Sequence, residues 1–406
     1  MRTALPKIIV LAGLIASCPC APGQESRTWT DLKGRKLEGT FVKQDETSVW
    51  VRRPDGKELT ILKKTLSKDD LEHLEEAPVS TTPAAAKGGR FDSVAIDPAA
   101  WKARPGGFKL QSLVYPTNLE TEHFIIGASP KTRPAVLLAY AEAAERVWAD
   151  IAADFPQIAD AFDGRRLPLL LTEGESEAKK VASWNLKHAQ DSRTVSPNYN
   201  LDTYIIAGFS LDEDFAEEAG LTSYGRMFRL DSKTAEHMRK TWPQRVHFLT
   251  EDILRQMVGS AKNNGDYSLS MVRLSLCYHR EELVCGKIES EVSFGGGSEV
   301  EGFKNGRNWA GATKKLLTAG ANPDIKSFLE SSAQKAQPRD LGFGLGLMHF
   351  IQADPARLDG FGKLLAAAGE EEECPDPEAF AKGLGFESPA ELNAAWRDYM
   401  LSDAFE

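Results

Sequence analysis

The chain has few of the side chains on which metal and nucleophile chemistry depend, with 7 histidines and 5 cysteines among 406 residues. The closest two histidines, His237 and His247, stand ten residues apart. A helix presents two ligands on one face when they are four residues apart, so a zinc site built on two histidines of one helix is excluded. The seven positions are His73, His123, His188, His237, His247, His279 and His349.

Basic residues and long apolar runs are also scarce. Lysine and arginine number 49 against 59 aspartates and glutamates, which leaves a formal charge of −10. This charge disfavours a protein that binds nucleic acid through general attraction to phosphates. Apolar residues make up 42% and charged residues 27% of the chain. That balance is usual for a folded globular protein, and it excludes a wholly disordered chain and a membrane protein with many spans.

The N-terminus has the pattern of an export signal. Arg2 and Lys7 give it a positive start, and residues 8–16 form a nine-residue apolar core. A bilayer span needs about 20 apolar residues, so we predict a signal peptide over residues 1–24. Two processing routes stay open, namely lipidation of Cys18 in a lipobox-like sequence and ordinary cleavage before Gln24. The protein is expected to be secreted, periplasmic or envelope-associated, with a membrane attachment only through a lipid on Cys18.

Three cysteines follow the signal, namely Cys277, Cys285 and Cys374. Cys277 and Cys285 lie in one predicted helix and are eight residues apart, which places them about 12 Å apart along its axis. This separation is too long for a disulfide if the helix is unbroken. We therefore expect buried thiols there.

Residues 25–76 have the pattern of short strands and turns that is typical of a small β domain. Val49 and Val51 alternate with Trp50 and Arg52, and a Pro-Asp-Gly turn at residues 54–56 leads into a second alternating run. Ser67 is a predicted N-cap for a closing helical turn over residues 68–75. Four or five short strands with such a turn predict a small all-β barrel.

The same segment resembles the first Sla homology domain, a Src-homology-like barrel. The matching features are the opening R-T-W-T of residues 27–30, Gly34, the Asp-Gly hairpin, and the leucine-serine-acidic turn before the last leucines. The resemblance implies a module that binds short peptides or proteins. Arg52, Arg53 and Lys57 flank the hairpin and are candidates for contact with an acidic peptide. The alternative is that they form a solvated charged edge that blocks strand pairing.

Residues 77–98 lack hydrophobic periodicity and contain the run STTPAAAKGG, which is typical of a flexible linker. Residues 99–406 form the third region. Strand patterns at residues 124–126, 167–171 and 203–209 surround a long amphipathic helix, and from Trp242 onward the pattern is almost entirely helical. Strands first and helices second predict a mostly helical α+β domain, and not a doubly wound parallel sheet.

This region resembles the peptidase-MA-like branch of the gluzincins, the thermolysin-like zinc peptidases. The resemblance rests on E-T-E-H-F-I-I-G at residues 120–127, P-L-L-L-T at 168–172, and the ending SPAELNAAWRDYML at 388–401. It implies a thermolysin-like fold and a helix that carries His-Glu-x-x-His. In such a motif the two histidines bind zinc, the glutamate activates water, and a glutamate on the next helix is the third ligand.

The matched helix lacks those ligands. Alignment with the family motif puts Glu251 and Arg255 at the two histidine positions and Asp252 at the position of the base. Glu281 matches the third ligand, and a one-residue slip would put Arg280 there instead. Glu251 and Asp252 also have a purely structural interpretation, as charges that complement a helix dipole.

We therefore predict a catalytically inactive peptidase homologue that binds proteins or peptides and needs no cofactor or metal. The alternative is an extracytoplasmic metallopeptidase with unorthodox ligands, for which His247, His279 and Glu281 are the candidates. A third possibility is a purely structural envelope protein.

Overall fold

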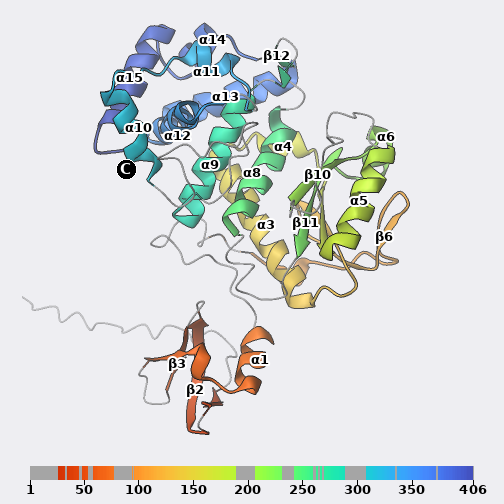
Figure 1. Cartoon of the computed structure of the whole chain (residues 1–406). Coiled ribbons are helices and arrows are strands. Elements are labelled where there is room, and N and C mark those ends of the chain that lie inside the picture. The colour runs from red at the N-terminus through yellow and green to blue at the C-terminus, as the bar shows by residue number, and fades with distance from the viewer. Residues whose placement is uncertain are drawn as a thin grey trace, which may run out of the picture. The chain divides into compact units, whose positions relative to one another are not determined.

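The protein is described here from a computed structural model, shown in Figure 1. The structure describes residues 26–32, 34–44, 48–53, 58–76, 94, 96–188, 206–230, 242–258, 262–263, 266–267, 269–288, 308–333, 336–371 and 374–405. The chain divides into two compact units, Met1–Ala77 and Pro78–Glu406. The predicted signal peptide with Cys18, and most of the predicted linker, lie outside the described residues.

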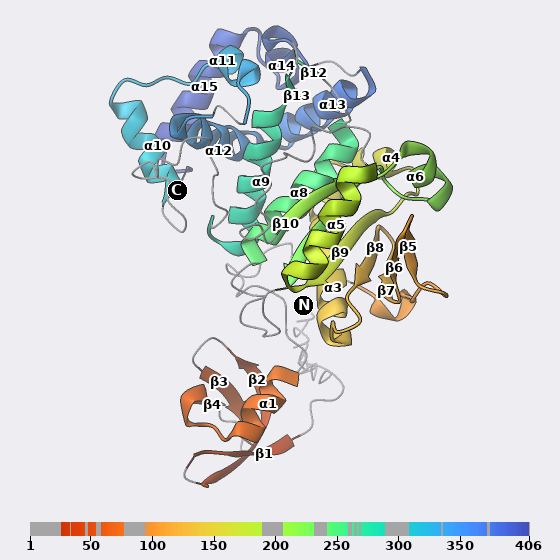
Figure 2. The same ribbon diagram turned by 45° about the vertical axis from the view of Figure 1, so that its right-hand side comes forward.

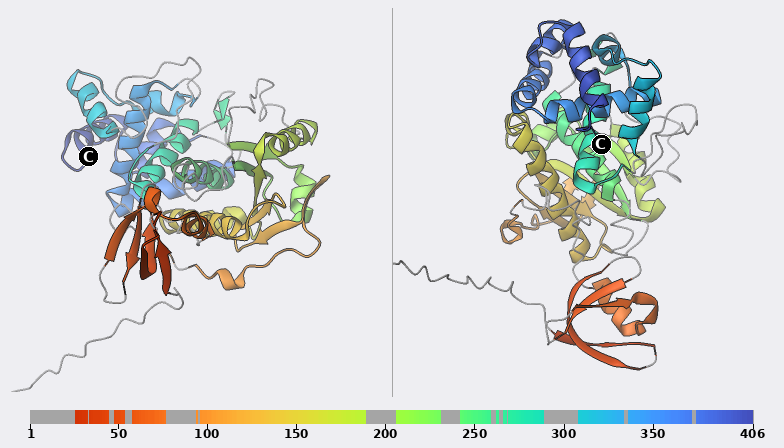
Figure 3. Two further views of the ribbon diagram at one scale, coloured as in Figure 1. Left: turned by 60° about the horizontal axis from the view of Figure 1, so that its bottom comes forward. Right: turned by 90° about the vertical axis from the view of Figure 1, so that its left-hand side faces the viewer.

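The first unit is an antiparallel sheet followed by a short helix (Figure 3). Its strands pair in sequence order as a meander, so the predicted antiparallel β structure is confirmed. Within the described part of this unit no ladder joins β1 to β4, and a closed barrel is therefore not found. The elements are β1 (Ser26–Thr30), β2 (Lys36–Gln44), β3 (Ser48–Arg52), β4 (Glu58–Leu62) and α1 (Lys68–Glu76).

Alternation along β3 produces the small core of this unit. Val49 and Val51 are fully buried and pack with Trp29, which is also buried. The predicted N-cap at Ser67 is confirmed, because its hydroxyl accepts the Asp70 N–H at 3.3 Å. Asp70 in turn accepts the Thr30 N–H at 2.6 Å, so the cap also joins α1 to β1.

The second unit is built on a five-stranded mixed sheet with the order β10-β11-β9-β8-β7. The three central strands β8, β9 and β11 are parallel, and β7 and β10 are antiparallel edge strands. A small hairpin, β5–β6, lies beside β8. The strands are β5 (Phe108–Leu110), β6 (Leu113–Tyr115), β7 (Thr117–Glu120), β8 (Phe124–Ala128), β9 (Leu167–Glu173), β10 (Ile206–Ser210) and β11 (Tyr224–Leu230).

The side chains of successive residues in the central strands pack into two different hydrophobic cores. Leu169 and Leu171 join the larger core, whereas Leu170 between them joins the smaller one. Because side chains alternate across a strand, a continuous apolar run requires cover on both faces of the sheet. Helices α3 (Pro134–Asp154) and α8 (Trp242–Val258) pack on one face, and α5 (Gly174–His188) packs on the other (Figure 2).

The order of elements therefore differs from the simple expectation of strands followed by helices. Helices α3, α5 and α6 (Glu213–Ala219) alternate with the strands from β8 to β11. The coarser division is confirmed, because the chain is β-rich at its start and mostly helical towards its end. Short strand patterns in the sequence did not reveal that three strands are parallel, since pairing direction depends on the crossover helices between them.

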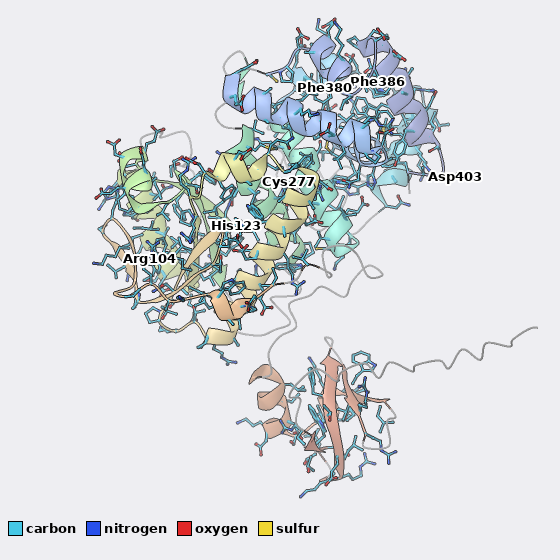
Figure 4. The ribbon with its side chains drawn as sticks, turned by 180° about the vertical axis from the view of Figure 1, so that it is seen from behind. Arg104, His123, Cys277, Phe380, Phe386 and Asp403 are labelled. Carbon is cyan, nitrogen blue, oxygen red and sulfur yellow. The ribbon has the colours of Figure 1, made fainter. Side chains whose placement is uncertain are left out.

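The helical part continues from α8 through α9 (Ser270–Cys285) to the C-terminal helices (Figure 1). Helix α9 is unbroken and carries the buried Cys277 and Cys285, so these two cannot bridge each other, as predicted. Figure 4 shows Cys277 within this helical part. None of the helices in the described ranges is long and apolar enough to cross a membrane. The remaining main helices are α10 (Trp309–Thr318), α11 (Ile325–Glu330), α12 (Pro338–Gln352), α13 (Pro355–Glu371), α14 (Pro377–Gly383) and α15 (Pro389–Leu401).

Candidate functional site

Three of the four positions that the family motif would assign to zinc chemistry lie on α8, where this helix packs against β11 and α9. These three, Glu251, Asp252 and Arg255, join Arg226 of β11 in a network of ion pairs. We call these four residues the α8–β11 ion cluster.

The buried half of the cluster is the pair Arg226–Asp252. Arg226 Nε donates to Asp252 Oδ2 at 2.8 Å, and Arg226 Nη2 donates to the other carboxylate oxygen. Asp252 is fully buried and Arg226 is 5% exposed. The guanidinium also lies over the Phe248 ring, 4.9 Å from its centre. A bidentate pair of this kind holds both groups in one orientation.

The more exposed half is formed by Glu251 and Arg255. Glu251 accepts hydrogen bonds from Arg226 Nη2 at 3.1 Å and from Arg255 Nη2 at 3.3 Å, so one arginine holds each of its oxygens. Arg255 stacks on Tyr224, with its guanidinium carbon 4.2 Å from the ring centre. The Glu251 and Arg255 side chains remain 28% and 26% exposed, and solvent or a ligand can therefore reach this end of the cluster.

The two carboxylates of the cluster differ in their electrostatics. Burial opposes the ionisation of Glu251, but electrostatic interactions with Arg226, Arg255, Arg273 and His247 outweigh it and lower the pKa of Glu251 to about 2. For Asp252 burial outweighs the attraction of Arg226, and the pKa of this carboxyl is raised. The cluster therefore keeps a firmly ionised carboxylate at its open end.

Glu281 on α9 is fully buried and turned towards α8. Its Oε2 lies 3.2 Å from Nδ1 of His247. Arg280 points away from this site, because its Nη1 donates to Asp150 on α3 at 2.8 Å. The structure thus places Glu281, and not Arg280, against α8.

His279 does not join this pair. Its ring packs against His349, with 4.7 Å between ring centres. Burial, together with His349 and Arg280, lowers the pKa of His279 well below its usual range. Of the three candidates for an unorthodox metal site, the fold therefore brings together only His247 and Glu281. In the part of the chain that the structure describes, no three His, Cys, Asp or Glu side chains form a group that could hold a metal ion.

Sequence reasoning missed Arg226 and Tyr224, which come from β11 and lie 25 or more residues before Glu251. No sequence signal could identify Arg226, because its contact with Asp252 depends on which strand lies above α8.

Among the described strands β10 is an edge strand, and it lies beside the cluster. The Leu211 N–H donates to the Ser223 carbonyl at 2.7 Å, which sets the phase of hydrogen bonding between β10 and β11. In this phase Gly208 and Ser210 turn their backbone polar groups away from β11. Asn185 of α5 accepts the outward Ser210 N–H at 3.1 Å. Among the described strands none pairs with the Gly208 side of β10.

The candidate peptide-binding residues of the first unit are only partly described. Arg52 and Arg53 are exposed at the end of β3. Lys57 lies outside the described residues, and the structure therefore does not show whether the three side chains gather.

We expect Glu251→Gln to lower the free energy of unfolding at neutral pH by about 1–3 kcal/mol, because the hydrogen bonds of two arginines lose their charged acceptor. A carboxyl whose pKa is lowered on folding stabilises the protein above its unfolded pKa, and this stabilisation is lost as the pH falls towards the folded value. The difference between parent and variant should therefore disappear as the pH falls from 4.5 to about 2. Denaturant titrations at several pH values measure it. Glu330→Gln, at an exposed position, is the control, and a difference that does not change with pH would contradict the expectation.

The chain was also compared with known proteins. No protein-family model, curated protein or solved structure matches it.

Proposed function

We propose that this protein is an exported, non-catalytic polypeptide-binding protein whose second unit is a peptidase-like scaffold without a working zinc site. The observation that carries the proposal is the α8–β11 ion cluster beside the open edge of β10. The resemblance to the gluzincins assigns a divalent cation to this helix, and here two guanidinium groups are bound to its carboxylates. The ion cluster lies beside a strand edge at which another chain can pair with β10.

The residues at the motif positions are poorly suited to hydrolysis. Arginine cannot give up its proton at physiological pH and is no metal ligand. Asp252, at the position of the base, is fully buried and has both oxygens bonded to Arg226. A general base must reach the water that it activates, and Asp252 has no such access. Glu251 is likewise held by two arginines, which compete with any cation for its oxygens.

The edge of β10 favours an extended polypeptide as the ligand. A strand edge offers N–H and C=O groups to an incoming strand, which binds by extending the sheet. Gly208 turns its backbone N–H and C=O to this edge, and the Tyr224 hydroxyl occupies the space where a Cβ of residue 208 would lie. A chain bound here would place alternate side chains over Tyr224 and towards Glu251 and Arg255.

The first unit supplies a second binding element in this proposal. Its resemblance to the Sla homology domain implies peptide recognition, and Arg52 and Arg53 are exposed beside the hairpin. An acidic peptide is the partner that this charge favours. The N-terminal pattern supports export, with a lipid on Cys18 as one form of attachment.

The alternative function is a metallopeptidase with unorthodox ligands. One observation favours it, namely the 3.2 Å contact between His247 and Glu281 on neighbouring helices. Metal analysis of the purified mature protein separates the two functions. About one tightly bound zinc per chain, with peptide cleavage that a chelator abolishes, would support the peptidase and contradict the binding protein.

Hydrogen–deuterium exchange of the full mature chain tests the proposed function. The probe is reduced, carboxymethylated α-lactalbumin, a permanently unfolded polypeptide, and β7 at the opposite edge of the same sheet is the internal control. We expect the probe to slow exchange in β10, because its backbone would pair with Gly208, and to leave β7 unchanged. Mass spectrometry should recover the probe intact. Unchanged exchange in β10, or fragmentation of the probe, would overturn the proposal.

A further inference from the structure

A basic groove follows the outer side of α5. It encloses about 410 Å³ and is lined by Ser112, Ser176, Lys179, Lys180, Ser183, Trp184, Lys187 and His188. Ser112 comes from the turn between β5 and β6, and the other lining residues come from α5. We call this hollow the α5 groove. It shares no residue with the α8–β11 ion cluster.

The charge of the α5 groove is opposite to that of the whole chain. The chain carries a formal charge of −10, yet the described lining includes three lysines and one histidine and no carboxylate. Lys179 forms an ion pair with Glu175, one turn earlier on α5. No ion pair is found for Lys180 or Lys187 within the described ranges. These two ammonium groups therefore concentrate positive potential in the groove.

Trp184 gives an independent indication of a ligand. It lines the groove and is 4% exposed, and its indole Nε1 is buried without a hydrogen-bond partner in the described structure. The ring is fixed by an edge contact with Phe209, with 5.9 Å between ring centres. A buried N–H that lacks an acceptor costs free energy. A side-chain shift that opens this N–H to the groove would let an acceptor oxygen of a ligand recover it.

The side chains in the groove favour phosphoryl groups over carboxylates. Lysine ammonium groups act as point charges that bind phosphate oxygens, and serine hydroxyls add donors, whereas carboxylate recognition favours the planar fork of arginine. Lys180 and Lys187 are seven residues apart, which corresponds to about 10 Å along the helix axis. Two cations at that spacing match a ligand with more than one phosphoryl group.

We propose that the α5 groove binds a linear ligand built of phosphoryl groups, which Lys180 and Lys187 hold by charge and whose oxygens accept hydrogen bonds from the groove, the Trp184 indole N–H among them. This site is independent of the polypeptide-binding edge at β10. A defect in one is not expected to remove the other, because different residues would contact the two ligands.

Indole N–H resonances of the full chain test the proposal, with inorganic tripolyphosphate as the probe and Trp184→Phe to assign the signal. We expect tripolyphosphate to shift the Trp184 resonance, and to do so at lower concentration than monophosphate or sulfate at equal ionic strength. Lys180→Gln/Lys187→Gln should weaken binding about tenfold, from two lost charge contacts. The matched control is Lys326→Gln/Lys382→Gln, which changes the charge equally at exposed positions on α11 and α14.

Three outcomes would overturn the proposal. One is an unchanged Trp184 resonance under saturating tripolyphosphate. Another is equal binding of monophosphate and tripolyphosphate, since that would mean general charge attraction. The third is an equal loss of affinity in the matched control variant.

Discussion

Replacing Arg280 by methionine is expected to lower the free energy of unfolding of the second unit by about 3–5 kcal/mol. Arg280 is 1% exposed and donates to Asp150 at 2.8 Å and to Asp154, both on α3. Gln352 of α12 also donates to Asp154 at 3.2 Å. Removing the guanidinium would leave two buried carboxylates facing each other without their cation. Their desolvation is then no longer offset, which is the costliest way to break a buried ion pair.

Denaturant unfolding of the full chain followed by far-ultraviolet circular dichroism measures this change. The signal reports mainly the second unit, because the described part of the first unit contains a single short helix, α1. The control is Arg280→Met combined with Asp150→Asn and Asp154→Asn, which removes the whole ion network. We expect this triple variant to recover most of the lost stability. A loss below about 1 kcal/mol in the single variant would show that Arg280 is dispensable there.

Replacing Arg226 by methionine should cost a similar amount, about 3–5 kcal/mol, for the same reason. Asp252 is fully buried and its principal cation is Arg226. Burial already raises the pKa of Asp252 above its usual 3.8, and without Arg226 it should rise further. A carboxyl with a raised pKa in the folded state destabilises the protein increasingly as the pH rises above the unfolded pKa. The variant should therefore lose more stability at about pH 7 than at about pH 4.

The matched variant for this test is Arg226→Met with Asp252→Asn, which removes both charges. It should be more stable than the single variant at neutral pH, and the gain should shrink as the pH falls. Denaturation of the parent, the two single variants Arg226→Met and Asp252→Asn, and the double variant at both pH values gives the coupling energy of the pair. A single variant whose deficit does not depend on pH would contradict the assignment of Asp252 as a buried charge.

Much of the local structure could be predicted from residue patterns. Val49 and Val51 alternate with the partly buried Trp50 and the exposed Arg52 in β3, Ser67 caps α1, and Cys277 and Cys285 share an unbroken α9. Each of these depends on contacts between residues close in sequence, where the periods of strand and helix determine which side chains share a face. Barrel closure in the first unit is a different matter, since it requires pairing of β1 with β4, and no such ladder is found in the described residues.

The candidate site could be predicted only in part. The positions Glu251, Asp252, Arg255 and Glu281 came from a resemblance, and the fold gathers the first three with Arg226. Glu281 instead contacts His247. No pattern in the sequence relates Arg226 to Asp252, because their contact arises from the packing of β11 on α8. A resemblance can mark positions in a helix, but it cannot supply the partners that other elements bring to them.

The amino-acid sequence by itself determined the local elements, the acidic balance of the chain and the absence of a helical pair of histidines four residues apart. These properties depend on composition and on short-range periodicity. The tertiary structure decided that two arginines bind the carboxylates of α8, that Gly208 lies on an edge strand of the described sheet, and that lysines of α5 border a groove with Trp184. These features join residues that are distant in the chain. The interaction energies between them arise only after the sheet order and the helix packing have brought the groups together.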